Sequence, residues 1–318
     1  MNKKLIASGT IASILLLNTG GVAFADSNKL NEDIFIKGAD LNSQQLEETK
    51  KKLDVDDGYK EISITTNDVA KYTGNNNLSF IHSSATITPK KFKKGVTVDI
   101  ETPENITRIT KEQYTNAAIT AGIQDSEIKV ASIDKVSGEG ALTGIYKAYE
   151  ENGNSLNKDD VQNANNEMND LASISEQNKG QKGYSDEALN NAIAEMKKEI
   201  ASEKQDGKNL TREDISKIVN DILKENGLNK ILSDNQINSI YNIMNNVSNS
   251  EILNKDPKAY EKQAKDLASN IKDKAGNLLD KAKELNTEEN RNFLQKIWDS
   301  IVEFFKKSLI GFYHGFSG

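Results

Sequence analysis

Three closely spaced glycines form the pattern with the most specific chemical precedent. Gly138, Gly140 and Gly144 follow an alternating run that predicts a strand over 127–133, and they open a predicted helix. Backbone N–H groups in such a glycine-rich turn bind the pyrophosphate of a dinucleotide. Here no acidic residue follows at the end of a second predicted parallel strand, and the chain becomes helical instead. We therefore predict that the glycines serve a tight turn and close helix packing, and that no cofactor binds.

Nucleophiles and soft metal ligands are scarce in this sequence. The chain has no cysteine, and its two histidines are His82 and His314. His82 precedes Ser83 and Ser84 in a predicted strand, but the G-x-S-x-G nucleophile pattern does not occur. Transition-metal sites need more imidazole or thiolate ligands than these. The sequence therefore predicts no catalytic residue and no metal site.

Carboxylates are abundant enough to keep a second chemistry open. Residues 54–58 resemble a calcium loop, but glycine stands at the fifth position of this segment rather than the sixth. A solvated acidic turn is the better interpretation. A pair of carboxylates can also hydrolyse glycosidic bonds, although aromatic residues make up only 6% of the chain and its one tryptophan is Trp298. A carboxylate-based extracellular hydrolase of wall polymers therefore stays as the alternative to a non-enzymatic protein.

The charge balance excludes one class of partner. The chain has 41 basic and 48 acidic residues, which gives a net charge of −7. Nucleic-acid binding requires an excess of basic residues that neutralises phosphates. We therefore expect no nucleic-acid partner.

The first 25 residues have the pattern of a targeting segment. Lys3 and Lys4 precede an apolar stretch over 5–17, and Ala23-Phe24-Ala25 forms a cleavage signature before Asp26. Serine and glycine interrupt the apolar stretch, which favours a cleaved signal peptide over a membrane helix. We expect residues 1–25 to be removed and the mature chain to be secreted, with association at the cell surface.

The remaining chain divides into two parts with different periodicities. Residues 26–152 predict a mixed α/β domain, in which the runs 78–88 and 96–101 form a hairpin across a basic turn. Residues 153–318 predict a helical domain, with capping patterns that begin at Thr211 and Ser233. The predicted fold class is therefore α+β. The predicted strands are 33–37, 61–65, 78–88, 96–101 and 127–133, with helices between and after them.

The helical part ends in a predicted amphipathic helix over 287–312. Its apolar half needs a cover, because burying such side chains is worth about 1.5–3 kcal/mol each. The helical domain itself can provide this cover, as can an envelope protein or a membrane surface. The candidate contact residues are Phe293, Ile297, Trp298, Ile301, Phe304 and Phe305.

Motif residues within the first part carry a resemblance. The runs 37–41, 83–84, 114–122 and 136–150 are similar to the YpuA-like family of secreted proteins from Gram-positive bacteria, a domain of unknown function. This resemblance implies an exported, envelope-associated protein, and it brings no catalytic residues. We therefore expect a non-enzymatic binding or structural protein of the envelope.

Overall fold

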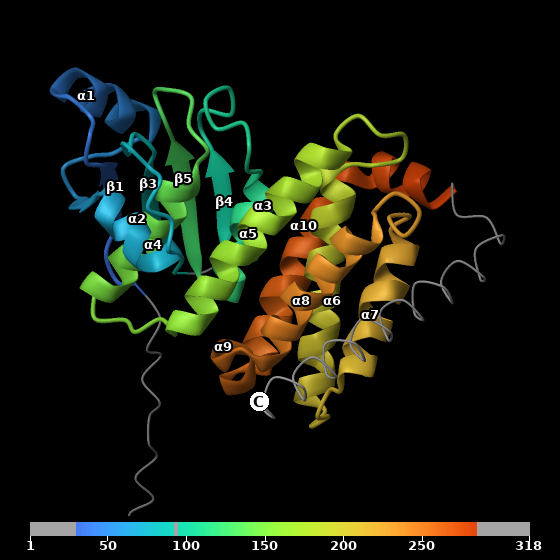
Figure 1. Ribbon diagram of the computed structural model, residues 1–318. Coiled ribbons are helices and arrows are strands. Elements are labelled where there is room, and N and C mark those ends of the chain that lie inside the picture. The colour runs from blue at the N-terminus through green and yellow to red at the C-terminus, as the bar shows by residue number, and fades with distance from the viewer. Residues whose placement is uncertain (1–29, 92–94, 285–318) are drawn as a thin grey trace, which may run out of the picture.

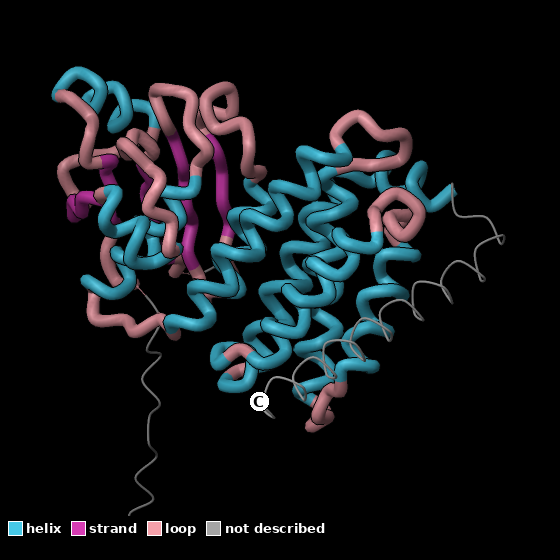
Figure 2. Tube along the Cα trace, viewed as in Figure 1, coloured by secondary structure: helices cyan, strands magenta, loops and turns pink. Residues whose placement is uncertain are grey.

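A computed structural model describes residues 30–91 and 95–284. A half that contains the β-sheet is followed by a half made of helices, which lie side by side in Figure 1 and Figure 2. Two large buried apolar clusters correspond to these halves. The predicted α+β class is therefore confirmed.

The sheet has five strands in the order β2-β1-β3-β5-β4. The central strand β3 runs antiparallel to β1 and to β5. The outer pairs, β1 with β2 and β4 with β5, are parallel. The strands are β1 (Ile34–Gly38), β2 (Lys60–Ile64), β3 (Ser84–Pro89), β4 (Thr97–Ile100) and β5 (Ser126–Ala131).

The predicted hairpin between 78–88 and 96–101 is wrong. The two strands β3 and β4 do not pair, because β5 lies between them and pairs with both. Ile128 and Val130 of β5 are fully buried, whereas Asp99 of β4 is largely exposed. The apolar strand therefore takes the interior position, and the strand with the exposed carboxylate takes the edge.

Helices cover both faces of this sheet. On one face α4 packs against β1, β2 and β3, while on the other Leu53 at the end of α1 packs against Phe35 of β1. Asn42, Thr65 and Thr110 begin α1, α2 and α3 with capping boxes that satisfy exposed N–H groups. The helices are α1 (Ser43–Lys52), α2 (Thr66–Thr73), α3 (Lys111–Thr120) and α4 (Glu139–Glu151).

The second half consists of helices, two of which begin at the predicted caps. Thr211 and Ser233 form capping boxes at the starts of α7 and α8, as predicted. No helix within residues 30–91 and 95–284 is long and apolar enough to cross a membrane. The helices are α5 (Lys158–Asn178), α6 (Asp186–Gln205), α7 (Arg212–Glu225), α8 (Asp234–Asn249), α9 (Glu251–Lys255) and α10 (Pro257–Glu284).

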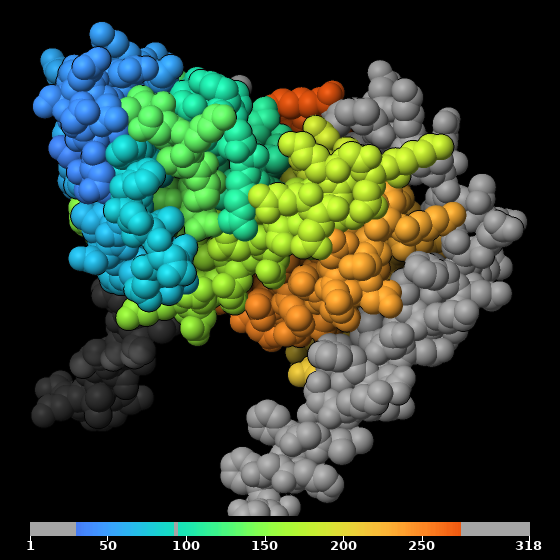
Figure 3. Space-filling view, turned by 45° about the horizontal axis from the view of Figure 1, so that its top comes forward, coloured from blue at the N-terminus to red at the C-terminus, as the bar shows by residue number. Residues whose placement is uncertain are grey.

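Helix α5 joins the two halves. Its Val161 and Met168 belong to the apolar cluster of the sheet half, while Leu171 belongs to that of the helical half. In Figure 3 this yellow-green helix lies between the sheet half and the orange helices. The core of the sheet half thus includes side chains beyond residue 152. Independent folding of residues 26–152 stays a prediction, as does the domain boundary there.

Candidate functional site

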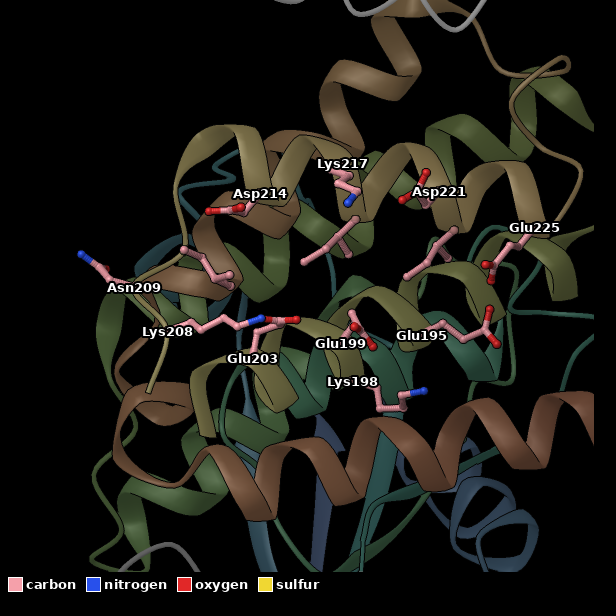
Figure 4. A pocket seen from close by; sticks show the side chains of 13 residues that line it. Glu195, Lys198, Glu199, Glu203, Lys208, Asn209, Asp214, Lys217, Asp221 and Glu225 are labelled. Carbon is pink, nitrogen blue, oxygen red and sulfur yellow. The ribbon is translucent and has the colours of Figure 1, made fainter. Parts of the chain in front are cut away.

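A groove of about 600 Å³ runs between α6 and α7. Its lining includes the apolar side chains of Leu210, Ile218 and Ile222, and Ile222 is 9% exposed. Charged side chains make up most of the remaining lining, as Figure 4 shows. The groove therefore combines an apolar base with a charged rim, which is the general anatomy of a binding surface.

Two rows of carboxylates face each other across the groove. The α6 row is spaced at i, i+4 and i+8, and the α7 row at i, i+7 and i+11, so each row occupies one helix face. Three ammonium groups accompany these six carboxylates, so the rim has an acidic excess. The rows are Glu195, Glu199 and Glu203 on α6, and Asp214, Asp221 and Glu225 on α7 (Figure 4).

Three of these carboxylates are held by other parts of the protein. Glu195 forms an ion pair with Lys272 of α10 and accepts a hydrogen bond from Asn226 at 2.8 Å. Glu203 forms an ion pair with Lys208. The Thr211 hydroxyl and N–H donate to Asp214, and these hydrogen bonds lower the pKa of that carboxyl. These three side chains are therefore fixed parts of the rim.

The other three carboxylates are available to a ligand. Glu199, Asp221 and Glu225 have no hydrogen bond or ion pair to any residue in 30–91 or 95–284. Across those same ranges, no group of three or more acidic or histidine side chains is arranged to hold a metal ion. The groove therefore presents unpaired negative charge above an apolar base, which suits an organic cation.

Side chains of the protein pack closely against the three glycines of the motif. Gly138 has φ of 96°, and a Cβ there would overlap the Tyr114 hydroxyl, which donates to the Gly138 carbonyl. A Cβ at Gly140 would lie 2.9 Å from Ser83 Oγ, and one at Gly144 would overlap Ile36. These glycines therefore allow α4 to approach the sheet.

His82 is paired with an acid that sequence patterns did not indicate. Its Nδ1 lies 2.7 Å from Asp134 Oδ2, and its ring lies 4.7 Å from that of Phe80. The neighbouring Ser84 hydroxyl instead accepts a hydrogen bond from the Gly38 N–H. Within the described residues no hydroxyl is bonded to His82, so the arrangement of a nucleophile and a base is not assembled.

The acidic turn over 54–58 uses its carboxylates within the fold. Asp54 forms an ion pair with Lys129 of β5 at 2.8 Å, and Asp56 accepts a hydrogen bond from the Gly58 N–H at 2.8 Å. These contacts engage two of the oxygens that a calcium ion would need. The turn therefore acts as a structural element beside the sheet.

A fully buried ion pair was also not indicated by the sequence. Glu167 of α5 and Lys197 of α6 have no exposed side-chain surface. Glu167 accepts a hydrogen bond from Thr120 at 2.6 Å, and Lys197 donates one to the Asn116 carbonyl at 2.8 Å. Because these partners come from α3, the pair links the sheet half to the helical half.

The candidate contact residues of the C-terminal helix lie outside the described residues. Phe293, Ile297, Trp298, Ile301, Phe304 and Phe305 belong to the range 285–318. Their contact with an envelope protein or a membrane surface stays a prediction. The groove residues described above were not singled out from the sequence, although the spacing of the acids on α6 was visible there.

Comparison with known proteins identifies relatives of unknown activity. The family described as "Protein of unknown function (DUF1002)" matches residues 37–267. The chain is 32% identical over 316 residues to the "Uncharacterized protein YpuA" of Bacillus subtilis (strain 168), a match that covers 96% of this chain and 100% of that protein. No solved structure matches the chain significantly. The resemblance to YpuA-like proteins is confirmed, and the chain belongs to the DUF1002 family.

Proposed function

We propose that the protein is exported and acts at the cell envelope as a non-enzymatic binding protein. Its groove between α6 and α7 receives a cationic, amphipathic segment of a partner protein. The observation that carries this proposal is the set of unpaired carboxylates Glu199, Asp221 and Glu225 above the apolar base of the groove. An amphipathic helix binds such a groove by placing its apolar face on the base and its charges at the rim.

The charge of the groove favours this partner over other classes. Nucleic acids and anionic lipid surfaces are repelled by carboxylate rows, whereas lysine and arginine side chains are attracted. The base offers too few apolar side chains to bind a wholly apolar segment. A partner segment therefore needs both basic and apolar residues at helical spacing.

The carboxyl groups with raised pKa do not support an enzyme in the groove. A general acid at neutral pH needs a raised pKa. Burial raises the pKa of Asp160 and of Asp170, but neither residue lines the groove. Asp160 instead accepts hydrogen bonds from the N–H groups of Glu251 and Ile252, at the start of α9. This favours binding over hydrolysis.

The test uses a labelled helical peptide of lysine and leucine, together with a matched peptide of glutamate and leucine. We expect the mature protein to bind the basic peptide saturably and the acidic one not at all. Substituting Glu199, Asp221 and Glu225 together by glutamine should weaken binding at least tenfold, which corresponds to about 1.4 kcal/mol. The control substitutes Glu47, Glu48 and Glu104, which are exposed on the sheet half, and should retain full affinity.

The same variants test the alternative hydrolase. Purified wall polymer is incubated with the mature protein, and soluble fragments are measured. We expect no release above that from buffer. Release by the natural chain that is lost in the triple glutamine variant would replace the binding proposal with the hydrolase.

A further inference from the structure

The apolar base of the α6–α7 groove matches a short helix in length. Leu210 and Ile218 pack against the core of the helical half but stay partly exposed. On α7 the rim runs from Asp214 to Glu225, which corresponds to about 17 Å or roughly three helical turns. A short helix with an apolar face therefore fits this groove.

The end of α10 lies within chain reach of the same groove. The end of α6 and the start of α10 line one cavity, while Lys272 of α10 pairs with Glu195 of α6. Helix α10 thus runs antiparallel to α6 and passes the groove at Glu195. It ends at Glu284, about 18 Å beyond Lys272 along the helix axis. Residues 285–292 span up to about 26 Å when extended, enough to return over that distance and across one helix width of about 10 Å.

The segment 293–307 has the length and the apolar face that this groove requires. It belongs to the predicted amphipathic helix over 287–312, and as a helix it spans about 22 Å. At about 100° per residue, its apolar side chains share one half of the helix circumference. They include Phe293, Ile297, Ile301 and Phe304.

The charges of this segment are arranged to meet a carboxylate rim. Lys296, Lys306 and Lys307 fall on both flanks of the apolar face, about 125–145° from its middle. A lysine at such a position reaches the rim of a groove, because its long stem extends along apolar surface. Asp299 and Glu303 fall closer to the opposite side, about 155–165° from the middle. With the apolar face on the base, the ammonium groups therefore meet the rim and the carboxylates point away from it.

We propose that the chain's own segment 287–312 occupies the α6–α7 groove and shields it until a partner segment displaces it, a regulation that rests on the proposed function. Its lysines pair with Glu199, Asp221 and Glu225, which have no partner among the described residues of the protein. Six carboxylates and three ammonium groups line the groove, so attraction of the lysines outweighs repulsion. Because the segment is tethered, its effective concentration is roughly millimolar, and a partner segment has to compete with it.

The experiment is photo-crosslinking of the full mature chain, with the crosslinked residues mapped by mass spectrometry. A benzophenone amino acid takes the place of Phe304. We expect its crosslinks within one chain to fall on residues 195–225. The matched control carries the benzophenone at the exposed Phe80 of the sheet half and should not label that range.

Peptide binding measures the shielding in the full chain. The variant Lys296→Glu, Lys306→Glu, Lys307→Glu places carboxylates against the rim, so we expect it to bind the lysine–leucine peptide at least tenfold more tightly than the natural chain. The control changes the net charge equally through Lys51→Glu, Lys91→Glu and Lys135→Glu, which are exposed on the sheet half, and should bind like the natural chain. Thermal melting identifies any variant that does not fold, and the crosslinks of the natural sequence then decide the matter.

The outcomes separate this regulation from the proposed function itself. Crosslinks from position 304 that fall outside 195–225, or only between two chains, would overturn the proposal. An equal and measurable peptide affinity of the natural chain and the variant with glutamate at 296, 306 and 307 would overturn it as well. Crosslinks inside the groove without peptide binding by either protein would refute the proposed function and still support the docked segment.

Discussion

The Lys197 ammonium lies 2.5 Å from a carboxylate oxygen of Glu167, and neither side chain has any exposed surface. The pair sits between α5 and α6, and α3 supplies a hydrogen-bond partner to each member. Burial lowers the pKa of Lys197, while the adjacent Glu167 opposes this change. The two halves are therefore coupled by charges that are stable only as a pair.

Removing one member of this pair should destabilise the fold strongly. We expect Lys197→Met to lower the free energy of unfolding by roughly 3–5 kcal/mol, because Glu167 is left as a buried, uncompensated charge. The double variant Glu167→Leu, Lys197→Met should recover most of the loss. Urea unfolding of the natural, single and double variants measures this coupling. A double variant whose loss equals the sum of the two single losses would show that the residues act independently.

Alkaline pH should weaken the fold through a buried phenol. Burial raises the pKa of Tyr149 to about 12, whereas an unfolded tyrosine has a pKa near 10. The folded state thus keeps a proton that the unfolded state has lost. Stability from this group is fully present below about pH 10 and falls as pH rises towards about 12, by up to roughly 3 kcal/mol.

Unfolding free energies measured between pH 9 and 12 check this sign. Tyr149→Phe should lose some stability at every pH, because the hydrogen bond from its hydroxyl to the Gln124 carbonyl disappears. Its stability should also decline less steeply with pH than that of the natural chain. If the free energies of unfolding of the two proteins fell equally with pH, Tyr149 would not be the group that causes the loss of stability at alkaline pH.

The glycines of α4 should be needed for packing. Gly144→Ala places a methyl group against Ile36 of β1 and should cost about 1–3 kcal/mol. Gly140→Ala meets the Ser83 hydroxyl, whose rotation can relieve the contact, so its cost should be smaller. Thermal melting of the two variants measures which one loses more stability. A larger loss for Gly140→Ala would contradict the account of how α4 approaches the sheet.

Export should remove the targeting segment. The signature at Ala23-Phe24-Ala25 predicts that the mature chain begins at Asp26. Intact-mass analysis of the protein recovered from the culture medium and from washed envelopes determines this end. A mass that retains residues 1–25 would remove the basis for the envelope location.

Local sequence patterns predicted which segments form helices and strands better than they predicted which of these elements lie next to each other. The helix caps at Thr211 and Ser233 could be predicted from the sequence, because a capping box involves residues that are three positions apart. The position of β5 between β3 and β4 could not be predicted, because strand order depends on which apolar strand takes the interior of the sheet. The pairing of Glu167 with Lys197, and the lack of a partner for Glu199 among the described residues, were hidden for the same reason. Whether a carboxylate is buried, paired or free is decided by distant segments.

The proposed function requires the unpaired carboxylates of the α6–α7 groove to attract cationic segments. Its most direct test reverses the charge with Glu199→Lys, Asp221→Lys and Glu225→Lys, and measures peptide binding by fluorescence anisotropy. The reversed protein should lose the lysine–leucine peptide and gain the glutamate–leucine peptide, while melting like the natural chain. Unchanged affinity for the lysine–leucine peptide would show that binding occurs elsewhere and would contradict the claim.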